Sequence, residues 1–365
     1  MPHQSRYRKS KLVADRTSFR TFRLASIDCL RLLAIFAVAA GHYWSKDPTI
    51  RIATFSWHVP MFFFLTGYLW SPKKTMNLEL RSRGKSLLIP YACWLITLEA
   101  MFICSTLIRA RTVPYSALVD IFYGGVRLGS LFAAFWFVPV LFISVIFVRL
   151  VYTYIGRLSH LIVFSVSFVS IIACMCWSQT LRNLPLDFFM AGPCSMFILS
   201  GQLLHWLETR LRVVWLIAIG LVLLSMSIPS FAIGLAAPLD IKLGILGTPI
   251  LSLIMSIALC GGMVIVAKTA IESHITRRLG QITSRLAQVI LPVMFVHPFA
   301  FLLFKKLGLS GVTCFTISVV SSFFGALVLN SLPLFSPFFV GIPRWNIHPS
   351  RRCENQAKDE YQGHR

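Results

Sequence analysis

The sequence predicts an all-α fold: a polytopic transmembrane bundle of about ten helices, with the N-terminus and the C-terminus both in the cytoplasm. The first observation behind this prediction is composition, since 56% of the 365 residues are hydrophobic and 13% are charged. Soluble globular proteins carry about a quarter charged residues. The second is a mean hydropathy of +0.73. A chain this apolar cannot place its surface in water, so lipid must cover it.

The third observation is a series of apolar segments long enough to cross ~30 Å of hydrocarbon at ~1.5 Å rise per residue. They lie at 27–45, 52–70, 86–108, 131–150, 161–177, 186–205, 213–231, 243–267, 286–304 and 311–333. Every connection between them is short, so we expect no soluble domain.

Lysine and arginine in the connections predict the orientation. With the N-terminus inside, the inner connections and ends hold 25 of the 35 basic residues and the outer connections hold nine. This asymmetry favours cytoplasmic termini and an even number of helices. We therefore expect a disordered basic cytoplasmic leader at 1–25, a membrane domain at 26–333 and a polar cytoplasmic tail at 334–365.

Charge and cysteine content exclude two function classes. The net charge of +22 is high, but the basic residues occur in short runs between apolar segments. Such runs are typical of membrane orientation signals, so we expect no nucleic-acid partner. The nine cysteines form no CxxC pair and no Cys/His cluster with zinc spacing, and most lie in or beside apolar segments. We expect packing residues there, no metal site and no bound cofactor.

The first apolar segment carries three ionisable residues, Asp28, Arg31 and His42. An aspartate or arginine in mid-membrane costs ~2.5–3.5 kcal/mol. Asp28 and Arg31 are three residues apart, and His42 returns to within ~20° of the face of Arg31, about 16 Å further along the helix. The three therefore form one stripe, which must face the bundle interior or a watery cavity. The structural alternative is a buried Asp–Arg pair with a hydrogen-bonded core histidine.

Later segments carry further polar candidates. His58 and Pro60 interrupt the second apolar segment, and Pro60 predicts a kink there. A basic cluster before the third segment can hold phosphates, although such clusters usually serve as topology anchors. It consists of Arg81, Arg83 and Lys85. Possible pocket residues deeper in the membrane are Glu99, Trp136 and His297, together with His58.

These motifs together resemble the acyltransferase-3 family of integral membrane acyltransferases. The family opens with Asp-x-x-Arg and then a histidine after ten intervening residues, which Asp28, Arg31 and His42 match. Further similar segments follow in the same order: FSWHVPMFFFLTGYLW, RSRGKSLLIPY, FWFVPVLF and GQITSRLAQVILPVMFVHP. Two departures are Thr66, where the family has serine, and Arg285 followed by Leu-Ala-Gln.

The resemblance implies transfer of an acyl group, usually acetyl from acetyl-CoA, to a sugar hydroxyl of a cell-envelope or secreted glycan. The expected partners are an acyl-CoA donor substrate, a glycan or lipid-linked sugar acceptor and the lipid bilayer. The expected location is the bacterial inner membrane.

The residue types suit this chemistry. Histidine has an unperturbed pKa near 6.5, so His42 is the candidate general base for a sugar hydroxyl, or alternatively a covalent acyl carrier. Arg31 would hold a donor phosphate, the pantetheine carbonyl or the developing oxyanion, and Asp28 would orient Arg31. The basic cluster of Arg81, Arg83 and Lys85 would bind the phosphates of CoA at the cytoplasmic mouth.

Two other function classes stay open on the sequence alone. Intramembrane charges also suit a transporter for a glycan or a small molecule, although no pair of matching broken helices marks two halves. A non-catalytic membrane scaffold is a third class, but it does not explain the aligned polar stripe of the first segment.

Overall fold

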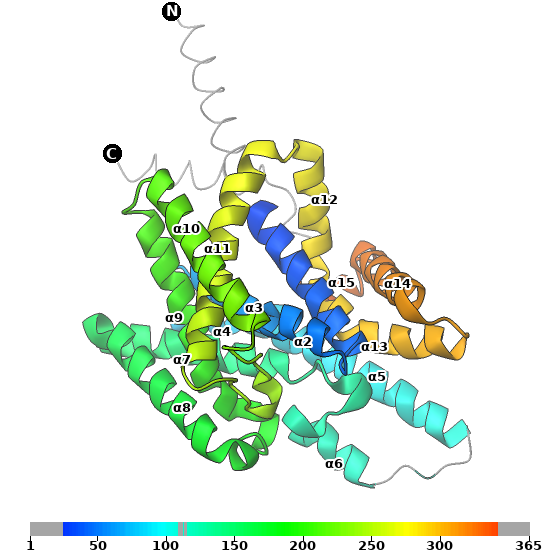
Figure 1. Ribbon diagram of the computed structural model, residues 1–365. Coiled ribbons are helices and arrows are strands. Elements are labelled where there is room, and N and C mark those ends of the chain that lie inside the picture. The colour runs from blue at the N-terminus through cyan, green and yellow to red at the C-terminus, as the bar shows by residue number, and fades with distance from the viewer. Residues whose placement is uncertain (1–24, 109–111, 113–114, 342–365) are drawn as a thin grey trace, which may run out of the picture.

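A computed structural model describes residues 25–108, 112 and 115–341 (Figure 1). Within these residues the regular structure is helical, apart from one isolated bridge between Asp240 and Ile245. The predicted all-α fold is therefore confirmed. Most of the leader predicted at 1–25 and the residues of the tail from 342 onward lie outside the described part of the chain.

The first helix spans Ala25–Tyr43. The later helices are α2 (Pro48–Phe55), α3 (His58–Tyr68), α4 (Met76–Arg83), α5 (Ile89–Ile108), α6 (Tyr115–Tyr123), α7 (Phe137–Ile155), α8 (Ser159–Leu181), α9 (Ala191–Glu208), α10 (Val213–Ala232), α11 (Leu251–His274), α12 (Arg277–Gln288), α13 (Ile290–Lys306), α14 (Gly311–Ser331) and α15 (Ser336–Phe339).

Seven helical stretches among the described residues are long and apolar enough to cross a membrane, or up to eight if the bent pair α12–α13 forms one span. One of them, Phe137–Leu181, contains both α7 and α8, joined by a turn at Gly156–Leu158. The chain is thus an integral membrane protein. The total of ten spans and the cytoplasmic location of both termini stay predictions.

The second predicted span, 52–70, is not one helix. Asp47 caps α2 by accepting hydrogen bonds from the backbone N–H groups of Thr49 and Ile50, at 2.8 and 3.1 Å. The chain then turns at Ser56 and Trp57 and restarts as α3, whose eleven residues rise only about 16 Å. Eight of these eleven residues are buried, so α3 is an internal helix rather than a lipid-facing span.

Two glycines allow α3 to pack directly on the backbone of α9. A Cβ atom on Gly67 would lie 1.9 Å from the carbonyl oxygen of Ile198, and one on Gly201 would lie 2.0 Å from that of Phe64. Small residues permit such close helix approach inside membranes. This crossing fixes the depth and the rotation of α3 in the bundle.

Aromatic contacts hold the first helix against the C-terminal helices. Phe36 stacks on Phe323 of α14 with ring centroids 5.7 Å apart, and Tyr43 meets Phe301 of α13 edge-on at 4.9 Å. On another side, a Cβ atom on Gly41 would lie 2.9 Å from the ring of Phe55 in α2. The polar residues of the first helix therefore lie inside the bundle.

The part of the predicted tail that the structure describes, residues 334–341, packs against the bundle. Its helix α15 packs against α5, where the indole N–H of Trp94 donates to the carbonyl oxygen of Phe339 at 2.9 Å. Val340 is buried at the same place. Val340 also lines the cavity described below.

The α3–α9 crossing leads to a stability prediction. We expect Gly201→Leu to destabilise the protein by about 3 kcal/mol, because the leucine meets backbone that cannot move aside without separating the helices. The measurement is thermal unfolding of the detergent-solubilised protein, together with its amount in the membrane. Gly325→Leu in α14 is the matched control, since a Cβ there meets nothing within 4 Å. Equal melting temperatures for the two variants would contradict the prediction.

Candidate functional site

A cavity of about 430 Å³ lies beside the N-terminal half of the first helix. We call it the donor-side cavity, after the acyl donor that the family resemblance implies. Its polar lining comes from three parts of the chain: Asp28 and Arg31 of the first helix, Thr66, Arg83 and Ser86 near α3 and α4, and Ser284 and Gln288 of α12. The remaining lining is largely apolar and includes Phe62, Leu87, Phe137, Leu141, Leu291, Met294 and Val340.

Asp28 and Arg31 form the expected ion pair, with guanidinium nitrogen and carboxylate oxygen 3.2 Å apart. The Asp28 side chain is 8% exposed, whereas that of Arg31 is 34% exposed and lines the cavity. A guanidinium carries five N–H donors, so the pair leaves donors for a ligand. Asp28 therefore orients Arg31 and offsets part of its charge.

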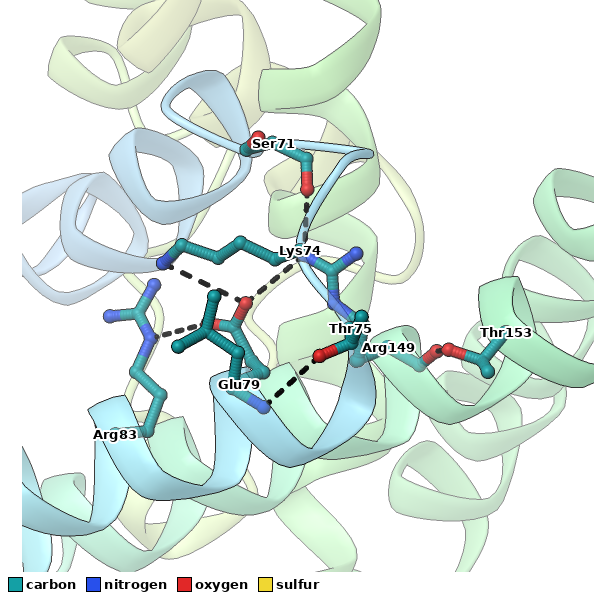
Figure 2. A network of polar contacts seen from close by, with 8 residues as sticks. Ser71, Lys74, Thr75, Glu79, Arg83, Arg149 and Thr153 are labelled. Atoms are coloured by element: carbon teal, nitrogen blue, oxygen red, sulfur yellow. Dashed lines mark hydrogen bonds and ion pairs between the residues drawn. The ribbon is translucent and has the colours of Figure 1, made fainter. Parts of the chain in front are cut away.

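Arg83 is fixed by a buried carboxylate that sequence reasoning missed. Figure 2 shows three cations converging on Glu79: Nε of Arg83 at 2.9 Å, a guanidinium nitrogen of Arg149 at 3.0 Å and Nζ of Lys74 at 3.8 Å. Arg149 also donates to the carbonyl oxygen of Ser71 at 2.8 Å. Because Glu79 and Arg149 are both almost fully buried, this network ties α4 to α7 and holds Arg83 at the cavity.

The structure divides the predicted basic cluster. Arg83 lines the donor-side cavity, whereas Arg81 and Lys85 are exposed and are not part of its lining. The four-residue spacing of Glu79 and Arg83 is a local signal that could have pointed to the pair. Arg149 lies 70 residues away from Glu79 in the chain, so no local pattern indicates its contact.

A second cavity, of about 260 Å³, lies beside the C-terminal end of the first helix. We call it the histidine cavity. Its polar lining consists of His42, Ser45, Arg51, His58, Trp136, Asp240 and Lys242. Three of the residues expected from the sequence, His42, His58 and Trp136, thus meet here, together with loop residues that the sequence did not single out.

The histidines differ in their partners. His58 donates from Nδ1 to the carbonyl oxygen of Thr54 at 2.6 Å, which leaves Nε2 as an acceptor in the neutral ring. The His42 ring lies 5.2 Å from that of His297. His297 is fully buried, donates from Nδ1 to Val293 at 3.1 Å, and has no partner for Nε2 within the described structure. His297 therefore lies next to His42 but is not part of the cavity lining.

Charged side chains from α2 and from the connection between α10 and α11 complete the histidine cavity. Arg51 pairs with Asp240 at 3.3 Å and lies over the Phe55 ring. Lys242 donates to the carbonyl oxygen of Leu128 at 2.7 Å. Burial lowers the pKa of Lys242, and the nearby carboxylates Asp187 and Asp240 oppose that shift. A carboxylate, two cations and an indole ring in one cavity can hold the hydroxyl groups and the apolar face of a sugar.

Glu99 lies apart from both cavities. It is buried in α5 and belongs to the lining of neither one. Of the ten residues that the sequence singled out, the structure thus brings six to the two cavities. It places His297 next to His42, outside the lining of the second cavity. Glu99, Arg81 and Lys85 line neither cavity.

The two cavities share part of their walls. Phe62, Phe137 and Met294 line both. A stripe along α3 also connects them, because His58 lines the histidine cavity, Phe62 lines both and Thr66 lines the donor-side cavity. This four-residue spacing puts the three side chains on one helix face. The first helix runs beside both cavities in the opposite sense, from Arg31 to His42.

Comparison with known protein families shows which family this chain belongs to. The acyltransferase domain of the acyltransferase-3 family matches residues 24–331. The chain belongs to this family. The protein is therefore a membrane acyltransferase, as the motifs of the first helix indicated. No curated protein and no solved structure shows significant similarity to the chain. The match includes every residue of both cavities except Val340.

The charge network of this acyltransferase predicts an asymmetry between its two buried partners. We expect Glu79→Gln to destabilise the protein by about 3–5 kcal/mol, because Arg149 is left without a carboxylate. Arg149→Met costs less, since Glu79 keeps Arg83 and Lys74. The double variant should be more stable than Glu79→Gln alone, because it buries no unpaired charge.

Thermal unfolding of the four proteins in the same detergent measures this. If the double variant loses the sum of the two single effects, Glu79 and Arg149 are not coupled and the network does not act as described.

Proposed function

We propose that this acyltransferase transfers an acyl group, most simply acetyl, from cytosolic acyl-CoA to a sugar hydroxyl of a cell-envelope or secreted glycan in the bacterial inner membrane. The observation that carries the proposal is the pairing of two cavities with complementary chemistry along one helix. One presents arginines, and the other presents histidines together with the lining of a sugar site.

The donor-side cavity suits the phosphates of CoA. Arg31 and Arg83 both line it, and arginine recognises phosphate oxygens with several charge-assisted hydrogen bonds. It also lies at the end of the bundle predicted to face the cytoplasm, where acyl-CoA is made available. Arg31 and His42 are about 16 Å apart along the helix, a distance that an extended pantetheine arm can cover.

The histidine cavity suits the acceptor and the chemical step. The sugar hydroxyl attacks the thioester carbonyl while His42 takes its proton, so that a C–O bond forms and the C–S bond breaks. His42 then returns the proton to the departing thiolate of CoA. A covalent acyl-histidine in place of the proton transfer is the alternative route. The resident groups do this chemistry without a bound cofactor.

The transporter alternative requires solute movement without an acyl donor. Membership of an acyltransferase family favours the enzyme over the transporter. Vesicles that accumulate a radiolabelled sugar in the absence of acyl-CoA would support the transporter instead.

A first prediction concerns donor binding. We expect Arg83→Gln to raise KM for acetyl-CoA about 10- to 100-fold, with a smaller change in kcat, because a hydrogen bond to a charged group contributes about 1.5–3 kcal/mol. Arg81→Gln is the matched control, since Arg81 lies four residues before Lys85 on the exposed face and outside the cavity. Transfer of radiolabel from acetyl-CoA to the glycan fraction of membrane vesicles gives both constants. Equal KM values for the two variants would remove Arg83 from the donor site.

A second prediction concerns the base. We expect His42→Ala to reduce glycan O-acetylation by about 10²- to 10⁴-fold, because general base catalysis contributes a factor of this size. The measurement is the O-acetyl signal of extracted glycan in proton NMR spectra, from cells that carry the wild type, the variant or no copy. His160→Ala serves as control, because His160 is exposed and lines neither cavity.

Each variant must reach the membrane at the same level. Wild-type acetylation in His42→Ala would retain the enzyme class but remove His42 as base. No acetyl signal with the wild type would count against the proposed acceptor.

A further inference from the structure

Three apolar side chains are the residues that line both of the described cavities. Phe62 comes from α3, Phe137 from α7 and Met294 from α13. The rings of Phe62 and Phe137 meet edge-on with centroids 5.5 Å apart, and the Phe63 ring also meets Phe137 edge-on at 5.4 Å. Phe137 and Met294 are buried, whereas Phe62 is half-buried.

The proposed reaction requires an acyl group to reach these side chains, so the inference rests on the proposed function. The phosphates of the donor bind at Arg31 and Arg83 in one cavity, and the thioester carbonyl must meet His42 in the other. The end of the pantetheine arm therefore has to enter between the three side chains. The acyl group, at the end of this arm, is the first part of the donor to meet these side chains.

The chemistry of the three side chains suits a passage that opens only for a small apolar group. Methionine is unbranched with three rotatable bonds, and it adapts its shape to what it contacts. None of the three side chains offers a strong hydrogen bond to water, so the closed wall separates the thioester from water. The surrounding interior is close-packed, so each additional methylene of the acyl chain must displace a side chain.

We propose that Phe62, Phe137 and Met294 form an apolar partition that determines the acyl chain length, admitting acetyl and rejecting longer groups. The partition lies between the donor phosphate site and the histidines, and its residues contact the acyl group rather than the acceptor. Phe62 is the residue whose size matters most, because it is half-buried and lies at the centre of the stripe from His58 to Thr66.

The experiment compares donors of increasing chain length. Membrane vesicles from cells that produce each variant contain the native acceptor, and they are supplied with radiolabelled acetyl-CoA, propionyl-CoA or butyryl-CoA. The readout is the ratio of butyryl to acetyl incorporated into the glycan fraction. We expect Phe62→Ala and Met294→Ala each to raise this ratio at least tenfold, because pocket size discriminates one methylene by roughly 10- to 200-fold.

A change in the other direction keeps the test informative if the truncated variants fold poorly. Phe62→Trp enlarges the side chain, and we expect it to lower the ratio of propionyl to acetyl transfer. Phe164→Ala and Met101→Ala are matched controls, because both side chains are exposed and lie outside the two cavities. Both controls should keep the wild-type ratios.

The outcomes separate the two proposals. Acetyl transfer that persists with unchanged ratios in the truncated and the enlarged variants would overturn the partition while leaving the enzyme intact. Wild-type vesicles that transfer no acyl group from any of the three donors would instead count against the proposed function itself.

Discussion

Charged groups inside hydrocarbon are expensive, and the architecture of this acyltransferase follows from how it accommodates them. Asp28 and Arg31 lie within a membrane-spanning helix, where an unpaired charge costs several kcal/mol. Their ion pair removes part of this cost, and the cavity that they line removes more by keeping Arg31 in contact with a polar space. The first helix must therefore lie inside the bundle, and α13, α14 and α2 surround it.

The same constraint explains the buried network that holds Arg83 at the donor-side cavity. Glu79 would be unfavourable alone, but Arg149, Arg83 and Lys74 all lie within ion-pair distance of its carboxylate (Figure 2). The network does more than neutralise the charge of Glu79. It holds α4 to α7 and thereby sets Arg83 at the cavity, so a structural ion pair positions a residue of the proposed donor site.

One short helix connects the two ends of the site. Because α3 is internal and packs through Gly67 and Gly201 on α9, its face from His58 through Phe62 to Thr66 extends along both cavities. The first helix contributes the complementary face. In the proposed reaction, this pairing places a charged donor at one end and a sugar at the other, with apolar side chains between them that keep water from the thioester.

The sequence by itself determined the properties that depend on local periodicity. Apolar segments of spanning length predicted an all-α membrane fold, and the spacing of Asp28, Arg31 and His42 predicted one polar stripe and the family. Tertiary structure alone decided the shortness of α3, the isolation of Glu99 and the separation of Arg83 from its exposed neighbours. It also brought Arg51 to Asp240, 189 residues away. The physical reason is range: helix geometry relates residues within a few turns, whereas contacts between distant segments depend on how whole helices pack.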